Sequence, residues 1–548
     1  MIKISKVFPK KEEKSMKKKI AALLMAAAMT AGLISGCGSS TDTSASTAAS
    51  ASEADAGGGT ESEPADEGEP YEITMQVVTW GQTPEELEQV ESAINDIILP
   101  EINATVSLQP VAAWDIVNES QMALTSGEKM DLVNIFVCGS GMDSVSNYTS
   151  KNMILPLNDL VEKYGSDIKS TLGELLSIGY QGDQLYAIPS NTTMGGDYGF
   201  LIRKDYLDQA GITVDESRVY TPEEAEETLL ALKEHFGEGY YGIALFGSSQ
   251  GSGQFFYDFY EVDMLGGNGS TGVVLDPLSG NKTVVNLFET DEWMNYCKTI
   301  YRWAQEGLIN PDATTISDDV TSQLQTGYYF ASTGSQIPGS DTQMATSVGT
   351  EFVQMTMIPA FSSTVTASQG LYAISRTSEN PEKVMQFLNI LYQERERGNS
   401  VAALLNAGLE GVSYEVTEEV GTGKAIVSAK EGSLWNVMIP AVYGDALTSP
   451  KYAPLTSDIY DEYIAFNEKI SNGRICDTFG YVFDPSEVSS EAAAVSAVVE
   501  QYLGLVGYGS VNPEEIMPEF IAALKDAGID EVIAANQAQL DAWFAAKQ

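Results

Sequence analysis

The chain has 548 residues, of which 30 are basic and 77 acidic, and its net charge is −47. This balance argues against nucleic acid as a partner, because proteins that bind it need a basic face. The single histidine, His235, and the four scattered cysteines, none in a CxxC pair, argue against histidine metal clusters, His-based nucleophile triads and a disulfide framework.

The first segment has the layout of a secretory signal. Three lysines (17–19) precede an apolar run over 20–34, and small residues lead up to Cys37. The four residues that end in Cys37 resemble a bacterial lipobox, in which the cysteine is acylated and becomes the new N-terminus. Fifteen apolar residues are short for a membrane span, which needs roughly 20. We therefore expect a signal peptide over 1–36, started at Met1 or Met16, and a lipid anchor on Cys37.

Residues 37–70 form the second segment, which we expect to be a disordered tether. From residue 38 onward it consists of Ser, Thr, Ala and Gly with eight acidic residues, two prolines and no large apolar side chain. Such a segment cannot bury enough apolar area to offset its ordering entropy. Removal of residues 1–36 takes away eight lysines and two glutamates, so the mature chain keeps 22 basic and 75 acidic residues, a net charge of −53.

Residues 71–137 predict a βαβαβ unit. Apolar and polar residues alternate over 71–77 and again over 104–108, and residues 132–137 form a buried apolar strand. Helical patterns lie between these strands, the first over 87–98 with Thr83 as N-cap and Glu86 as capping-box acid, the second over 114–126 with Gly127 as its end. Such a unit indicates a parallel sheet covered by helices. Ligands bind such sheets beyond the carboxyl ends of the strands, which here means Trp80, residues 110–114 and residues 138–140.

Several stretches further along, in this order and spacing, resemble the landmarks of family 1 extracellular solute-binding proteins, the receptors that feed ABC importers, mostly with sugars. They are SGEKMDL at 126–132, ILPL at 154–157, GDQLYAIP at 182–189, RKDYL at 203–207, WAQEGLINPD at 303–312, NPEKVMQFLN at 380–389 and LLNAGLEGVSY at 404–414. The last, with Gly480-Tyr481-Val482-Phe483 and the tail at 539–543, is similar to a lipoprotein subgroup with an extended C-terminal region.

The resemblance implies an α/β, two-lobed periplasmic-binding-protein-like (type II) fold whose hinged lobes close on a ligand cleft. It suggests a first lobe from 71–188 plus about 330–372 and a second lobe from 189–329 plus 373–548. Pro189, the Gly195-Gly196 pair and the stretch 334–339 are places where the chain could change lobe without breaking an element. Helices are expected behind Thr221, over 222–236, and over 292–305.

A sugar presents hydroxyl groups and a faintly apolar C–H face, so its site needs flat aromatic rings edged by polar side chains. The chain has 26 tyrosines and six tryptophans, most of which must be core. Trp80 fits a cleft role better than packing, Trp114 fits both equally, and Tyr186 could equally pack in the hinge. Trp293 and Trp303 are expected in the core. The ligand-binding candidates are Trp80, Trp114, Tyr186, Asn191, Tyr198, Tyr257, Glu261, Trp435 and Asn436.

The sequence thus predicts a lipid-anchored extracellular receptor that binds a carbohydrate, expected to be an oligosaccharide, and delivers it to ABC permease subunits. The receptor is expected to be a monomer. No catalytic residue, metal site or cofactor is expected, since the HExxH, EF-hand and GxxxxGK[ST] patterns do not occur. Two alternatives stay open. One is a tethered glycoside hydrolase with two carboxylates. The other is a receptor for peptides or another non-sugar solute.

Overall fold

The computed structural model describes residues 68–136, 144–245, 254–265, 269–316, 318–367, 370–435, 438–439 and 442–547. The predicted signal peptide, the lipidation site Cys37 and nearly all of the tether lie outside these ranges. So do Asn436 and the residues of the 138–140 turn.

The first sheet has five strands in the order β2-β1-β3-β13-β6. Strand β1 (Tyr71–Thr79) pairs in parallel with both β2 (Ala104–Ala112) and β3 (Leu132–Phe136), and α2 (Leu87–Ile102) and α3 (Ile116–Ser126) connect them. The βαβαβ prediction is confirmed. Two later strands, β13 (Gly370–Ile374) and β6 (Ala187–Pro189), complete the sheet, with β13 antiparallel to both of its neighbours.

The predicted N-cap of α2 is wrong. The helix begins at Leu87 behind Glu86, and no side chain caps it, whereas Thr83 is an exposed loop residue. The Glu86 carboxylate instead accepts hydrogen bonds from the Ser433 hydroxyl and from the N–H of Leu434, at 3.1 Å for the latter. A partner almost 350 residues away therefore takes the carboxylate that a capping box would use. The C-terminal end of α3 is as predicted, because Gly127 adopts the left-handed conformation there.

The second sheet has four strands in the order β12-β7-β11-β8. Strand β7 (Gly196–Arg203) is antiparallel to β11 (Tyr329–Gln336) and β12 (Phe352–Phe361), and β8 (Tyr241–Ala244) is parallel to β11. The helices of this part of the chain are α7 (Lys204–Ala210), α8 (Pro222–Phe236), α10 (Val320–Gln325) and α11 (Ser340–Val348). Helix α8 begins behind Thr221 as predicted, with a complete capping box formed with Glu224.

The two sheets define two lobes, and the boundaries expected for them need correction. Strands β11 and β12 were expected to return to the first lobe with residues 330–372, but they pair in the second sheet, and only β13 joins the first. Residues 384–443, expected in the second lobe, supply much of the first lobe's core. The stretch 334–339 is therefore not a change of lobe, since it leads from β11 to α11. Sheet partners are long-range contacts that glycine and proline positions do not encode.

The first lobe's core lies on both faces of its sheet. Residues 132, 136, 372 and 374 face a cluster built with α2 and with the helices α5 (Asn158–Tyr164), α6 (Ser166–Leu172), α13 (Pro381–Ile390) and α14 (Val401–Ala407). Residues 133, 135, 371 and 373 face a second cluster that includes Tyr148 of α4 (Val145–Thr149). The alternation follows from the period of two along a strand.

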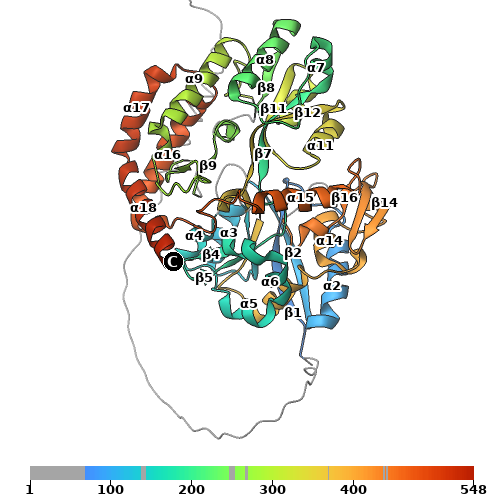
Figure 1. Cartoon of the computed structure of the whole chain (residues 1–548). Coiled ribbons are helices and arrows are strands. Elements are labelled where there is room, and N and C mark those ends of the chain that lie inside the picture. Colours follow the sequence, from blue (N-terminus) through green and yellow to red (C-terminus); the bar gives the residue numbers. More distant parts are fainter. Residues whose placement is uncertain are drawn as a thin grey trace, which may run out of the picture. The chain divides into compact units, whose positions relative to one another are not determined.

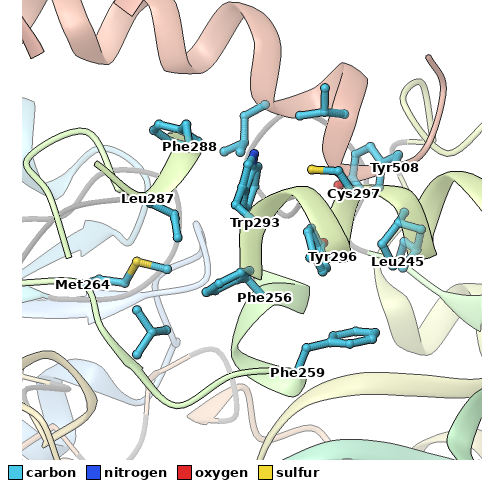
Figure 2. Close-up of a cluster of buried hydrophobic side chains, with 14 of the residues drawn as sticks. Leu245, Phe256, Phe259, Met264, Leu287, Phe288, Trp293, Tyr296, Cys297 and Tyr508 are labelled. Carbon is cyan, nitrogen blue, oxygen red and sulfur yellow. The ribbon is translucent and has the colours of Figure 1, made fainter. Parts of the chain in front are cut away.

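The largest cluster of the second lobe's core lies between its sheet and four helices, and a smaller cluster with α10 and α11 covers the other face of the sheet. Helices α9 (Asp291–Gln305), α16 (Ser489–Gly507), α17 (Pro513–Asp526) and α18 (Ile529–Ala546) lie together on one side in Figure 1. Figure 2 shows the aromatic centre of this core, where Trp293 of α9 lies 5.6 Å from Phe256 and 5.2 Å from Phe288, between ring centroids. Trp293 and Trp303 are buried, as predicted, and Cys297 and Cys476 are buried free thiols.

The remaining elements are short or peripheral. A three-stranded sheet of β14 (Tyr414–Gly421), β15 (Lys424–Ala429) and β16 (Lys451–Tyr452) lies next in the chain to α15 (Ile459–Ser471). The small strands are β4 (Tyr180–Gln181), β5 (Gln184–Leu185), β9 (Val262–Asp263) and β10 (Val274–Leu275), and α12 (Thr364–Ala367) follows β12. The 3₁₀ helices are η1 (Gly173–Gly179), η2 (Gln254–Asp258), η3 (Leu287–Glu289), η4 (Arg397–Asn399), η6 (Ala446–Thr448) and η7 (Pro485–Val488). None of the helices in the described part of the chain has the length and apolar composition of a membrane crossing.

Candidate functional site

Strand directions bring the carboxyl ends of the parallel strands of both sheets to the crossings between the lobes. Because β13 is antiparallel to β3 and to β6, β6 runs in the same direction as β1, β2 and β3. The chain leaves β6 at that edge, passes through the first crossing (residues 190–195) and begins β7. In the second sheet, β11 and β8 run opposite to β7 and therefore end where β7 begins. Ligands bind beyond such carboxyl ends, so the crossings mark the candidate site.

Two exposed tryptophans lie at this edge of the first lobe. Trp80 directly follows β1 and is 50% exposed, and Trp114 follows β2 and is 61% exposed. They are brought together through Gly81, where an added Cβ would lie only 2.5 Å from Cζ2 of Trp114. The Trp114 ring therefore lies against the backbone next to Trp80. Both rings keep a free apolar surface, which is unusual for so large a side chain.

On the second lobe, Tyr198 and Tyr257 stack with 5.5 Å between ring centroids and 18° between planes. Tyr198 lies near the start of β7 and is buried, whereas Tyr257 of η2 is half-buried. The structure thus brings together two of the predicted site residues that are 59 positions apart. The pair adjoins Phe361 at the end of β12 and so lies at the crossing end of the second sheet.

Asp258 follows Tyr257 and is fully buried. It accepts a hydrogen bond from the Thr333 hydroxyl, and its Oδ1 has no hydrogen-bond partner among the described residues. Burial raises the pKa of this carboxyl to about 8, so it is mostly protonated at pH 7. The sequence analysis selected the neighbouring Tyr257 but not Asp258, because the burial of Asp258 depends on β11.

Asn191 and Glu261 are held by other side chains. In the first crossing, Asn191 donates from Nδ2 to Asp445 at 2.7 Å, and its carbonyl accepts from the N–H of Leu447 at 3.1 Å. Glu261 forms an ion pair with Arg474 at 2.5 Å, and the same guanidinium donates to the carbonyl of Ala360 at 2.6 Å. Both residues therefore support the crossings, and ligand contact by either stays a prediction.

Two further candidates lie within the first lobe. Trp435 is 2% exposed and packs in the core, with its Cγ 3.0 Å from where a Cβ on Gly408 would lie. In this arrangement it is a core residue. Tyr186 is half-buried and packs against the cluster around β3 and β13, which agrees with its hinge alternative. Among the residues that the structure describes, no group of three or more acidic, cysteine or histidine side chains is arranged to hold a metal ion.

Comparison with known proteins gives the family. Residues 91–397 match the model described as "Bacterial extracellular solute-binding protein". The chain belongs to this family. Residues 477–545 match a second model, a domain of unknown function (DUF3502). The predicted resemblance is thereby confirmed, and with it a solute-binding protein rather than an enzyme.

Relatives along the whole chain agree with this assignment. A "Carbohydrate ABC transporter substrate-binding protein" from Streptococcus pneumoniae serotype 4 (strain ATCC BAA-334 / TIGR4) is 23% identical over 545 residues, which cover 98% of this chain and 100% of the relative. The crystal structure of the N-glycan transport solute binding protein (NgtS) from Streptococcus pneumoniae is similar, with a TM-score of 0.72, 20% identity, and coverage of 87% of this chain and all of that one.

The same protein in complex with Man5GlcNAc is similar with a TM-score of 0.66 and 21% identity, over 87% of this chain and 99% of that one. At such identities the likeness establishes the fold, which is the predicted α/β, two-lobed binding-protein fold.

Proposed function

We propose that this solute-binding protein captures a carbohydrate, an oligosaccharide of the N-glycan type, beside the crossings between its lobes. The observation that carries the proposal is the pair of exposed indoles, Trp80 and Trp114, at the carboxyl edge of the first sheet. Flat rings with a free face suit the apolar C–H surface of a sugar ring. The glycans named for the similar Streptococcus pneumoniae proteins support the same ligand class.

The proposed binding step makes and breaks no bond. A sugar that touches Trp80 on one lobe and the Tyr198–Tyr257 pair on the other interacts more favourably when the lobes are close. Binding then shifts the population toward the closed arrangement, by at most the difference in affinity between the two arrangements. The closed complex would deliver its ligand unchanged to an ABC permease.

Isothermal titration calorimetry of the soluble mature protein with Man5GlcNAc tests this function. We expect saturable binding, and recovery of the glycan intact after incubation. Trp80→Ala should weaken binding by roughly 1 to 3 kcal/mol, the range for an aromatic anchor, while leaving the melting temperature almost unchanged because the ring is half exposed.

Tyr328→Ala serves as the matched control. Tyr328 is 55% exposed and precedes β11, at the end of the second sheet that is remote from the crossings. Its removal should leave the affinity unchanged. Equal affinity for the wild type and Trp80→Ala would remove Trp80 from the site, and hydrolysis of the glycan would contradict the receptor function.

We also propose that a lipid anchor at Cys37 holds the protein at the outer side of the cell membrane. The acidic tether then connects this anchor to the lobes. The extracellular family and the signal-like sequence before Cys37 support this location. Mass spectrometry of the membrane-bound protein should detect an acylated Cys37 as the first residue.

A further inference from the structure

One segment near the C-terminus, residues 474–483, belongs to the cores of both lobes. Phe479 packs in the first lobe's cluster with Tyr148, Ile178 and Ala187. Tyr481 and Phe483, two and four positions later, pack in the core of the second lobe. All three rings are at least 90% buried. The segment is therefore itself a crossing between the lobes, and its packed side chains belong to both cores.

Backbone hydrogen bonds fix this segment to the crossing that follows β12. The N–H of Ser362 donates to the carbonyl of Arg474, and the N–H of Cys476 donates to the carbonyl of Ser362, both at 2.8 Å. The N–H of Gly480 donates to the Thr364 hydroxyl at 2.8 Å.

The segment also bonds directly to the first lobe. Ser146 of α4 donates from its hydroxyl to the carbonyl of Phe483 at 2.8 Å. At Gly480, where φ is +87°, an added Cβ would lie 3.2 Å from the Ser177 hydroxyl oxygen, so the backbone itself approaches the first lobe closely.

The last helix, α18, holds the segment from the side of the second lobe. The Tyr481 hydroxyl donates to Oδ1 of Asn536 at 2.7 Å, and the Tyr481 ring meets Trp543 edge-on with 5.7 Å between centroids. Lys547 lies over the Trp543 ring at 3.5 Å and donates to the carbonyl of Phe479 at 3.3 Å. The Gly480–Phe483 motif and the tail around Trp543, both noted in the sequence, thus meet in one structure.

We propose that Phe479 is a positioning residue for ligand capture: it is the pivot that limits the angles between the lobes, and the domain of unknown function over 477–545 serves to hold it. The inference rests on the proposed function of capture between the lobes. Phe479 is anchored in the first lobe, whereas its carbonyl is bonded to Lys547 and the rings of Tyr481 and Phe483 are packed in the second lobe. The chain therefore passes from one core to the other beside the Phe479 ring, and we expect the lobes to turn about this ring. Without the Phe479 ring, the free protein would sample a wider range of angles between the lobes. Ligand binding would then have to restrict a larger set of conformations, which weakens the affinity.

The test measures the distance between the lobes without any ligand. A keto amino acid is introduced at Met122 of α3 and at Tyr328, both highly exposed and in different lobes, and is labelled with nitroxide for pulsed electron resonance. In the mature protein we expect a narrow distance distribution. In Phe479→Ala we expect a broad one, which becomes narrow again on addition of Man5GlcNAc, with affinity reduced about tenfold, within the usual range of coupling between sites.

Phe520→Ala is the matched control, because Phe520 is equally buried but belongs only to the core of the second lobe. It should lower stability and keep the distribution narrow. Lys547→Met removes the bond to the Phe479 carbonyl and the cation–π contact with Trp543 but keeps the Phe479 ring. This variant and Phe479→Leu should broaden the distribution to a lesser degree, and they replace Phe479→Ala if that variant does not fold.

A distribution that stays narrow in the folded Phe479 variants would overturn the proposal and leave Phe479 a core residue only. This outcome is separate from failure of the proposed ligand class, since the distances are measured before any glycan is added.

Discussion

At the scale of single residues, Gly81 is the position that keeps the two exposed indoles together. Its φ is +79°, and an added Cβ would lie 2.5 Å from Trp114. Gly81→Ala should therefore displace the Trp114 ring and cost about 1 to 2 kcal/mol of stability, the typical cost of a left-handed alanine.

Calorimetry with Man5GlcNAc should show Gly81→Ala binding as weakly as Trp114→Ala. The double variant should be no weaker than either single variant, because both changes remove the same ring. Gly127→Ala is the control, since Gly127 is also left-handed but has open space around its Cβ position. It should cost similar stability and leave affinity intact, and a loss of affinity there would undermine the explanation.

The buried Asp258 should make the protein's unfolding free energy fall as pH rises. Its pKa is raised by burial to about 8, whereas an unfolded aspartate has a pKa near 3.9. Between these values the folded protein binds a proton that the unfolded chain does not, so this residue's contribution to stability falls as pH rises, by up to about 1.4 kcal/mol per pH unit.

Urea unfolding at intervals from pH 4 to 8 measures this effect. Asp258→Asn cannot titrate, so the unfolding free energy of the wild type minus that of the variant should decrease steadily across this range. If the unfolding free energies of the two proteins change with pH in parallel, Asp258 is ionised in the folded protein. The hydrogen bond from the Thr333 hydroxyl would then be the main interaction that stabilises its buried charge.

At the scale of elements, two helices with similar sequence signals differ in their caps, which suggests a paired test. Helix α8 has both bonds of a capping box, from Glu224 N–H to Thr221 Oγ1 at 3.3 Å and from Thr221 N–H to the Glu224 carboxylate at 2.9 Å. Thr221→Ala should lower the unfolding free energy by about 1 kcal/mol, as at other N-caps. Thr83→Ala, at the cap predicted for α2 but not used, should change it by less than about 0.5 kcal/mol.

The caps of helices α2 and α8 also show which features of the structure the sequence could predict. Caps such as Thr221 and Gly127 and the βαβαβ alternation depend on neighbours within a few residues, and these predictions were confirmed. The Glu86 carboxylate failed as a cap because Ser433 and Leu434 compete for it. Trp80 could be placed at the carboxyl edge of the first sheet, since it directly follows a strand. The burial of Trp435 could not be foreseen, because it depends on packing beneath α14.

At the scale of the whole molecule, the course of the chain between the lobes was the least predictable feature. Strands β11 and β12 lie close in sequence to β13, yet pair in the other sheet. Local patterns identify a strand but not its partner, because one alternating surface fits many neighbours. The same limit applies to the C-terminal helices, whose pattern alone does not distinguish a separate domain from a part of a lobe.

The structure places those helices in the second lobe's core, and Phe520 of α17 tests the consequence. Its ring lies 4.9 Å, between centroids, from both Phe288 and Tyr502. Phe520→Ala should cost about 3 to 5 kcal/mol and lower the unfolding midpoint of the whole second lobe, by near-ultraviolet circular dichroism in urea. Leu505→Ala on α16, 38% exposed, should cost less than about 0.5 kcal/mol. A separate early transition of the C-terminal helices in Phe520→Ala, with the rest of the lobe unchanged, would instead mean that residues 477–545 fold as an appended domain.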